Sequence, residues 1–493
     1  MGISRALPGR WVFLGIVVAA VTACATGTGE PSFETEAPTA RPGSPIAVPT
    51  PLPTAADGST PAPSPTPVSS PGDPIVPIPT PTVTHDAPSA LPTLEPLPTY
   101  SPSVSGGSDQ QDGSDPPPSG AQNPWSFVSD RQCGDGPLFS SFPMDLDVVP
   151  NLSPLGAVNP PGHTFPTSHM YFAVPVIWGE VGEGPFGDGQ IFPPTPVYAV
   201  ADGQLSSLSI STVTTSLSGE VVSYTEYGFD LAVCEGIRVR YGHVGPVSDR
   251  ILESVEGLEG FNCNAYSTGD FAVDGCTYAP FLDLAAGEQV GFNSGRAAAL
   301  DIGVFDTITQ TIDFLHPELV GEEATGSLCL LDQYSPEQSA ELAALLGNGE
   351  LLRTANPICG VLNFDLPGTL RGNWFNDVST FSNEDLNIAF VYDQVIPDQP
   401  IISIGFVPGI DSAAHMFTPE DEGRVNLRFA EVAAGDGVYC YENLRDRFDR
   451  VHPDKHLLVE IPEPGRLLVQ AAVGASCGEG PWQLDADATE FLR

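Results

Sequence analysis

The sequence predicts a mainly β protein with a long extended segment ahead of its globular part. About 370 of the 493 residues follow residue 123, enough for two domains of ordinary size, and short apolar runs separated by turn residues recur along them. Residues 24–123 are instead rich in Pro, Thr, Ser and Gly, a composition that cannot bury a core. We therefore expect a disordered, partly polyproline-II tether over 24–123, followed by mostly-β domains over 124–322 and 323–493.

The amino terminus has the features of an export signal. Arg5 and Arg10 precede an apolar run over 11–20 that is too short to span a bilayer as a mature helix. The run ends in the tetrapeptide VTAC at 21–24, which resembles the lipobox of bacterial lipoproteins. The resemblance implies removal of 1–23 and a lipid on Cys24, and hence an extracytoplasmic protein anchored to an inner or outer bacterial membrane. The alternative is an ordinary secretory signal in which Cys24 is incidental.

The charge of the chain excludes one class of partner. It has 62 acidic and 18 basic residues, for a net charge of −44, and its only lysine is Lys455. Such a surface repels nucleic acid and anionic lipid headgroups, so we expect no nucleic-acid partner. No Asp-rich loop has the spacing of a calcium site, so the acidic residues are interpreted as a solvated surface.

The cysteines also fit export. Eight follow Cys24, and an even number in an exported protein predicts disulfides, although eight cysteines allow 105 pairings. No Cys-x-x-Cys spacing suggests a zinc site. Cys263 with Cys276 is the favoured pair because it closes a short loop. Two weaker predictions by nearness in sequence are Cys329 with Cys359 and Cys440 with Cys477.

Local patterns then predict the elements in order. β-branched or alternating runs favour strands at 196–200, 237–241 and 300–305. A helix is predicted over 335–346, with Ser335 as N-cap, Pro336 at the first helical position, Gln338 completing a capping box and Gly347 as the stop.

These strands and one turn carry a family resemblance. Residues 195–203 (TPVYAVADG) resemble the GTPVYAVADG segment of lysostaphin-type (LytM) zinc endopeptidases, and 240–244 (RYGHV) resemble their YGHL strand. Residues 286–291 (AGEQVG) resemble their GQxIG turn, and 300–304 (LDIGV) fall where the family has HLHFEV. The order holds over about 160–306, interrupted by insertions. The resemblance implies a LytM-like β-sheet domain of a family that cuts peptides of the bacterial cell wall.

The resemblance also implies a zinc site, which this sequence keeps only in part. The family holds zinc by the His and Asp of an H-x-x-x-D motif and by the second His of H-x-H. The first His of that pair and the YGHL histidine activate water. His169 matches the first ligand, but Ala173 stands at the ligand aspartate. Ala299 replaces a water-activating histidine and Asp301 the ligand histidine, whereas His243 keeps its family identity.

Three interpretations of this site remain open: a working hydrolase, a metal site with little turnover, and a metal-free binding module. We expect His169, His243 and Asp301 to meet in a cleft. His163 could supply another nitrogen to zinc if the chain near Pro166 folds back, since an extended strand would separate His163 from His169 by about 20 Å. The favoured reading is binding or regulation of peptidoglycan or an envelope protein without efficient turnover; the alternative is a divergent zinc endopeptidase.

The region after residue 325 resembles no family that we can name. Apolar runs at 388–392, 401–405, 438–441 and 467–470 predict strands of a sandwich or barrel. The segment 368–375 (GTLRGNWF) is either a ligand platform or a tight turn with Trp374 in the core, and the second reading is favoured. His452 and His456 are four residues apart, but Pro453 disfavours a helix, and a metal pair is not expected.

We predict that Cys24 carries the membrane anchor. The variant Cys24→Ser should move from the membrane fraction to the soluble fraction, because the thiol that accepts lipid is gone. Partition is measured by fractionation and blotting of cells expressing either form, and unchanged membrane partition of the variant would contradict the anchor.

Overall fold

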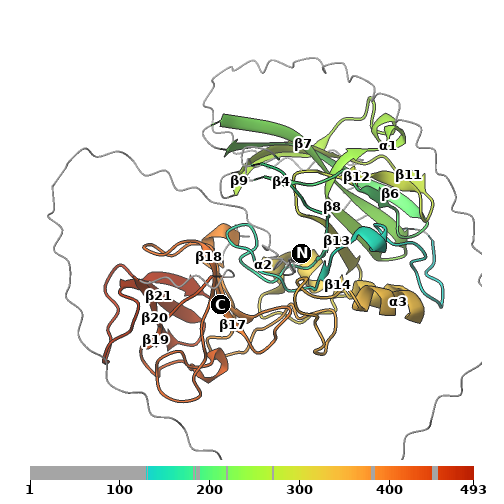
Figure 1. Ribbon diagram of the computed structural model, residues 1–493. Helices are drawn as coiled ribbons and strands as arrows, with labels where there is room; N and C mark the ends of the chain where they lie inside the picture. The colour runs from blue at the N-terminus through green and yellow to red at the C-terminus, as the bar shows by residue number, and fades with distance from the viewer. Residues whose placement is uncertain are drawn as a thin grey trace, which may run out of the picture. The chain divides into compact units, whose positions relative to one another are not determined.

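The computed structural model describes residues 129, 131–180, 184, 189–217, 220–268, 271–378, 384–446 and 454–493. The export signal, Cys24, the tether over 24–123 and His452 lie outside these residues. The described chain is mainly β, as predicted (Figure 1). Its short helices are α1 (Asp249–Glu253), α2 (Pro317–Thr325), α3 (Pro336–Ala343), η2 (Leu146–Val148), η3 (Leu330–Gln333), η4 (Glu384–Leu386) and η5 (Phe429–Glu431). Within the described residues, no helix is long and apolar enough to cross a membrane.

A large antiparallel sheet forms the first part of the fold. Its strands follow the order β1-β2-β13-β8-β7-β6-β10-β9, with β5, β11, β12 and β14 attached to its sides. Their bounds are β1 Leu152–Ser153, β2 Met170–Ala173, β13 Ala299–Asp306, β8 Ile237–Val247, β7 Glu220–Cys234, β6 Gly203–Leu217, β10 Phe271–Tyr278, β9 Phe261–Thr268, β5 Pro196–Tyr198, β11 Leu282–Leu284, β12 Gln289–Asn293 and β14 Ser327–Leu328. A separate two-stranded ribbon joins β3 (Ile177–Trp178) to β4 (Gln190–Ile191).

The three strands predicted from local patterns at 196–200, 237–241 and 300–305 lie in this sheet as β5, β8 and β13. Strand β13 is buried along almost its whole length, because β2 and β8 flank it and Leu300, Ile302 and Val304 on one of its faces pack into the main apolar core. The long strands β6 and β7 pair with each other beyond this core, and β6 also pairs with β10 of the β9–β10 hairpin. The extension falls in the insertions that interrupt the family motifs.

The C-terminal region contains two four-stranded antiparallel sheets. One has the order β15 (Gly372–Trp374), β16 (Ile388–Tyr392), β17 (Pro400–Ile404) and β18 (Ala413–Met416), and the other β19 (Tyr439–Tyr441), β20 (Lys455–Glu463), β21 (Arg466–Val473) and β22 (Thr489–Leu492). One apolar core serves both sheets. Trp374 is fully buried in it and its Nε1 donates to the carbonyl oxygen of Leu370 at 2.8 Å. The 368–375 segment therefore places its tryptophan in the core.

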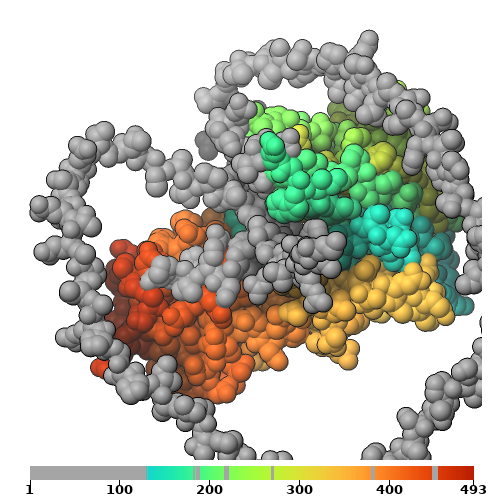
Figure 2. All heavy atoms as spheres, viewed as in Figure 1, coloured from blue at the N-terminus to red at the C-terminus, as the bar shows by residue number. Residues whose placement is uncertain are grey.

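A further apolar cluster joins the two regions. Phe165, from the segment before β2, packs against Phe375 with ring centroids 5.1 Å apart, in a cluster that includes Ala389 and Val391 of β16. Arg353 donates from its guanidinium to the carbonyl oxygen of Gln394 at 2.6 Å. In Figure 2 the yellow-to-amber residues that include α3 lie between the cyan-green and the orange-red parts of the surface. Residues on both sides of position 323 thus share part of their packing.

The predicted helix forms as α3 but is shorter and capped differently than expected. Ser335 Oγ accepts from the backbone N–H of Gln338 at 3.3 Å, as an N-cap should. The side chain of Gln338 does not complete the capping box, because its Nε2 donates to the carbonyl oxygen of Ser140 at 3.4 Å. The helix ends at Ala343, three residues before the predicted end. Leu346 instead joins β1 through an isolated bridge to Leu152.

All eight described cysteines are paired. The pairs are Cys133–Cys234, Cys263–Cys276, Cys329–Cys359 and Cys440–Cys477. Cys263–Cys276, the pair that the sequence favours, links β9 to β10. The sequence argument did not single out Cys133–Cys234, whose members lie 101 residues apart. Four disulfides fit an extracellular location.

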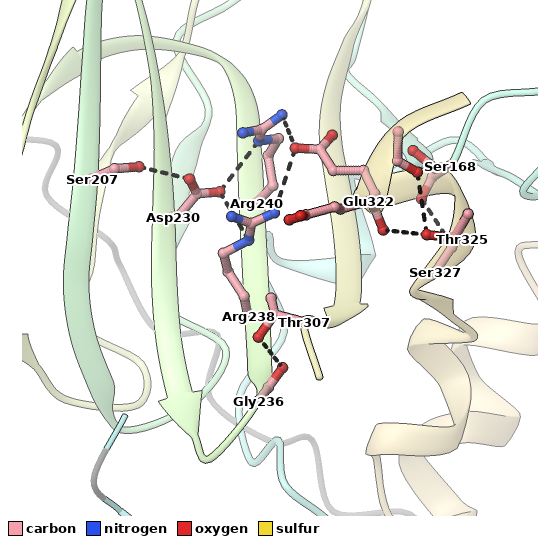
Figure 3. Close-up of polar contacts among 12 residues, drawn as sticks. Ser168, Ser207, Asp230, Gly236, Arg238, Arg240, Thr307, Glu322, Thr325 and Ser327 are labelled. Atoms are coloured by element: carbon pink, nitrogen blue, oxygen red, sulfur yellow. Dashed lines mark hydrogen bonds and ion pairs between the residues drawn. The ribbon is translucent and has the colours of Figure 1, made fainter. Parts of the chain in front are cut away.

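A buried ion network ties β6, β7 and β8 to α2 (Figure 3). Asp230 of β7 lies between Arg238 and Arg240 of β8, with its Oδ1 3.8 Å and 3.2 Å from their Nε atoms. Ser207 of β6 donates to Asp230 at 2.6 Å, and Glu323 of α2 pairs with both arginines. Burial raises the pKa of Asp230, but the two guanidinium charges and the Ser207 hydrogen bond outweigh it and hold that pKa below its ordinary value.

We predict that Asp230→Ala destabilises the fold strongly. Removing Asp230 leaves Glu323 as the one carboxylate paired with the two arginines in the described network, so positive charge there is no longer balanced, which costs about 3–5 kcal/mol in comparable sites. Urea unfolding followed by circular dichroism measures the loss. Asp274→Ala, an exposed position on β10, is the matched control and should change the free energy of unfolding by less than about 0.5 kcal/mol. Equal effects of the two substitutions would contradict the role of the network.

Candidate functional site

Three neighbouring strands bring the predicted site residues together. In the register of the sheet, Asp301 of β13 lies opposite Tyr171 of β2 and opposite Gly242 of β8. His169 directly precedes β2, and its Nε2 is 3.3 Å from Oδ2 of Asp301. His243 follows Gly242, and its Nε2 is 3.5 Å from the same oxygen. We call His169, His243, Asp301 and Glu226, introduced below, the histidine–carboxylate site.

The backbone of β8 is irregular where it carries His243. The pairing between β7 and β8 shifts between Tyr227 and Phe229, so that β8 has an extra residue there, and His243 has a φ of 56°. A bulge of this kind turns a side chain away from the regular alternation of the strand. Gly242 leaves room for Asp301, since a Cβ at residue 242 would lie 3.1 Å from the Cβ of Asp301.

His163 lies beside His169, because the chain before β2 folds back. The backbone N–H groups of Asn159 and His163 each donate to the other residue's carbonyl oxygen, at 2.8 Å and 3.1 Å. Thr167 is hydrogen-bonded in the same way to 156–157. The rings of His163 and His169 consequently lie 5.3 Å apart by centroid, in an edge-on arrangement. Of the two alternatives left open by the sequence, the chain takes the folded-back one, because these turn hydrogen bonds reverse its direction between His163 and His169.

Glu226 completes the site and was not predicted. His243 donates from its Nδ1 to Oε1 of Glu226 at 2.8 Å. Glu226 lies on β7, in the inserted part of the hairpin, where no family motif marks it. No signal in the sequence could have assigned it, since the bulge of β8 decides which β7 residue His243 meets.

The three histidines at the site have pKa values shifted in different directions. Glu226 is the main cause that raises the pKa of His243 to about 10, against the effect of burial, and Asp301 adds to the rise. Burial lowers the pKa of His169 well below its ordinary value, and His163, His243 and Arg240 lower it further. Burial also lowers the pKa of His163 to about 4. At neutral pH, His243 is therefore an imidazolium, whereas the other two histidines are neutral.

Asp301 has a raised pKa and a carboxylate oxygen without a hydrogen-bond partner. Burial raises its pKa to about 6, an effect that the positive His243 opposes and the negative Glu226 reinforces. Its side chain is 12% exposed, and its Oδ1 is buried without a hydrogen-bond partner. The Nε2 of His169 is also buried and makes no hydrogen bond, although it lies 3.3 Å from Oδ2 of Asp301. Such atoms cost free energy unless a ligand satisfies them.

The residues fit a family zinc site only in part. Ala173 of β2 and Ala299 of β13, the two positions where the resemblance implies a zinc ligand and a water-activating histidine, lie directly opposite one another. Neither side chain can donate to a metal. No group of three or more His, Cys, Asp or Glu side chains within the described ranges is arranged to hold a metal ion. The complete ligand set of the family is therefore missing.

Two surface hollows lie on the sheet extension. One of about 470 Å³ is lined by Asn262, Cys263, Asn264 and Thr277, and one of about 420 Å³ by residues of β6, β9 and β10. Neither borders His169, His243 or Asp301. The expected cleft around these three residues thus stays a prediction.

Comparisons with known proteins leave the chain without an assigned family. No family model, curated protein or solved structure matches it.

We predict that Glu226→Gln lowers the pKa of His243, because it removes the main charge that holds the proton. The ring resonances of His243 are followed by NMR against pH. Since its folded pKa is raised, His243 contributes stability that is complete below about pH 6.5 and is lost as pH rises to about 10. Unfolding free energies should therefore fall less over this interval in Glu226→Gln than in the wild type.

The exposed Glu256 supplies the matched control for this prediction. Glu256→Gln should leave the titration of His243 at its wild-type position. An unchanged His243 pKa in Glu226→Gln would overturn the assignment of Glu226 as the dominant neighbour.

Proposed function

We propose that this protein is a membrane-anchored extracytoplasmic lipoprotein with a degenerate LytM-type fold, which binds or regulates a cell-envelope component without efficient turnover. The observation that carries the proposal is the opposed pair Ala173 and Ala299. One stands where the family has a zinc ligand and the other where it has a water-activating histidine. Both losses fall at one point of the sheet, so the site lacks a metal ligand and a proton acceptor side by side.

The state of His243 supports the same conclusion. This is the one water-activating histidine that the chain retains, and it is held between Glu226 and Asp301 at 2.8 Å and 3.5 Å. An imidazolium cannot accept a proton from water, nor can it offer a lone pair to a metal. With a pKa of about 10, it would hold its proton over the physiological pH range. It therefore serves better as a fixed positive charge in a binding surface.

Peptidoglycan is the first candidate ligand, on the family resemblance, and an envelope protein is the second. Four disulfides and an acidic surface support a partner outside the cytoplasm rather than a nucleic acid. A lipid on Cys24 and a tether over 24–123 would hold the globular part within reach of the wall.

One observation favours the alternative function, a divergent zinc endopeptidase. His169 Nε2 and Asp301 Oδ1 are buried without partners, and the 3.3 Å between His169 Nε2 and Asp301 Oδ2 suits two ligands of one tetrahedral zinc. His163, whose ring lies beside His169, would be the third ligand in place of the missing aspartate. Zinc bound there would polarise a substrate carbonyl and lower the pKa of a bound water.

The decisive prediction is binding without cleavage. The full mature chain should sediment with purified peptidoglycan sacculi but release no new amino groups from them, even with added zinc. Loss of one positioned acid or base alone removes a factor of roughly 10²–10⁴ in rate. Binding is quantified by sedimentation and cleavage by amine labelling.

A matched variant separates the two functions. His169→Ala should leave an already negligible rate unchanged. Brisk, chelator-sensitive cleavage that disappears in His169→Ala would establish the enzyme, and absence of sedimentation would reject peptidoglycan as the ligand.

A further inference from the structure

A short loop holds Arg296 beside the histidine–carboxylate site. The loop spans 294–298, between β12 and β13. At its start, the backbone N–H of Ser294 donates to the carbonyl oxygen of His243 at 2.9 Å. At its end, the N–H of Val174 donates to the carbonyl oxygen of Ala298 at 2.9 Å. Both ends are therefore fixed to the strands that carry the site.

The loop is also fixed internally. Ser294 Oγ accepts from the backbone N–H groups of Arg296 at 3.2 Å and of Ala297 at 3.0 Å, which makes a Ser turn. Arg296 consequently extends from a backbone position that is set in advance. A preset backbone reduces the entropy that a ligand must overcome on binding.

The guanidinium of Arg296 has an aromatic neighbour and no acid. Its Cζ lies 5.1 Å from the ring centroid of Tyr224 on β7. Across the described ranges, neither an ion pair nor a side-chain hydrogen bond engages this guanidinium, although the chain has 62 acidic residues. A guanidinium on an aromatic face keeps its in-plane N–H donors free for a planar anion.

The face of the sheet that carries Tyr224 continues from β7 across β6, β10 and β9. Tyr224 lies two residues from Glu226 on β7, and therefore on the same face. Cross-strand pairs on that face run from Tyr224 to Val213, then to Val273 and finally to Tyr266. Tyr266 is 53% exposed, whereas Val213, which follows Tyr224 in this series, is only 4% exposed. The four residues form a ladder that leads from Arg296 to the edge of the sheet, and we call it the tyrosine ladder.

We propose that Arg296 binds the terminal carboxylate of a peptide, whose preceding residues lie along the tyrosine ladder. The proposal rests on the proposed function, of which it names the ligand class. One guanidinium matches one carboxylate through two parallel hydrogen bonds. Glu226 and Asp301 lie nearby and would repel a dianionic phosphate more than a singly charged peptide end. Tyrosine rings supply apolar area together with a hydroxyl for the peptide backbone.

The test compares two ligands that differ only at the carboxyl end. A synthetic wall stem pentapeptide with a free terminal carboxylate and the same peptide as an amide are titrated calorimetrically into the full mature chain. We expect the acid to bind at least about tenfold more tightly than the amide, the usual effect of a charged hydrogen-bonded pair. Arg296→Gln should weaken the acid to the level of the amide.

Arg250→Gln is the matched control. Arg250 belongs to α1, is exposed and is paired with Glu288. The variant should retain the wild-type preference for the acid. Equal binding of acid and amide to the wild type overturns the role of Arg296. If neither peptide binds while sacculi still sediment with the protein, the terminal-carboxylate ligand is wrong and the proposed function stands. If the sacculi do not bind either, the proposed function fails as well.

Discussion

The site depends on the register of β13 between β2 and β8. Asp301 meets both histidines only because it lies opposite Tyr171 on one side and Gly242 on the other. A slip of one residue would turn Asp301 to the opposite face of the sheet. Burial along β13 opposes such a slip, since it would turn Asp301 into the apolar layer occupied by Leu300, Ile302 and Val304.

The buried ion network holds the same strands from within. Arg240 lies two residues before Gly242 and opposite Gly303 of β13, so its position is set by the register that sets Asp301. Through Glu323 it also connects β8 to α2. A set of two buried and two half-buried charges is poor evidence for net stability, but it penalises any arrangement that separates its members. We interpret the network as a device that specifies the pairing of β7 with β8.

The C-terminal region also takes part in positioning the site. Glu384 of η4 accepts the backbone N–H of Phe165 at 3.2 Å, in the segment that leads from His163 to His169. Burial raises the pKa of Glu384 to about 7, which the hydrogen bonds from Phe165 and Thr164 oppose. Phe165 itself packs into the cluster shared with β16. The histidine segment is thus held by residues more than 200 positions later in the chain.

The sequence was informative wherever a local pattern decides the structure. Strands β5, β8 and β13, the N-cap Ser335 and the buried Trp374 all follow from alternation, capping chemistry or aromatic burial. It was uninformative where a tertiary contact decides. The Gln338 side chain leaves the capping box for Ser140, and turn hydrogen bonds bring His163 to His169. Glu226 and Arg296 have no motif, since a bulge and a loop contact place them.

The site balances much of its own charge within the described residues. In a zinc site the ion's charge balances nearby carboxylates and lone pairs. Here the imidazolium of His243 lies between Glu226 and Asp301 and balances them in a similar way. The balance is incomplete, because two carboxylates face one imidazolium, and the guanidinium of Arg296 lies on the same face of β7. A ligand that brings its own carboxylate to Arg296 would pair with the guanidinium and leave the contacts of His243 with Glu226 and Asp301 intact.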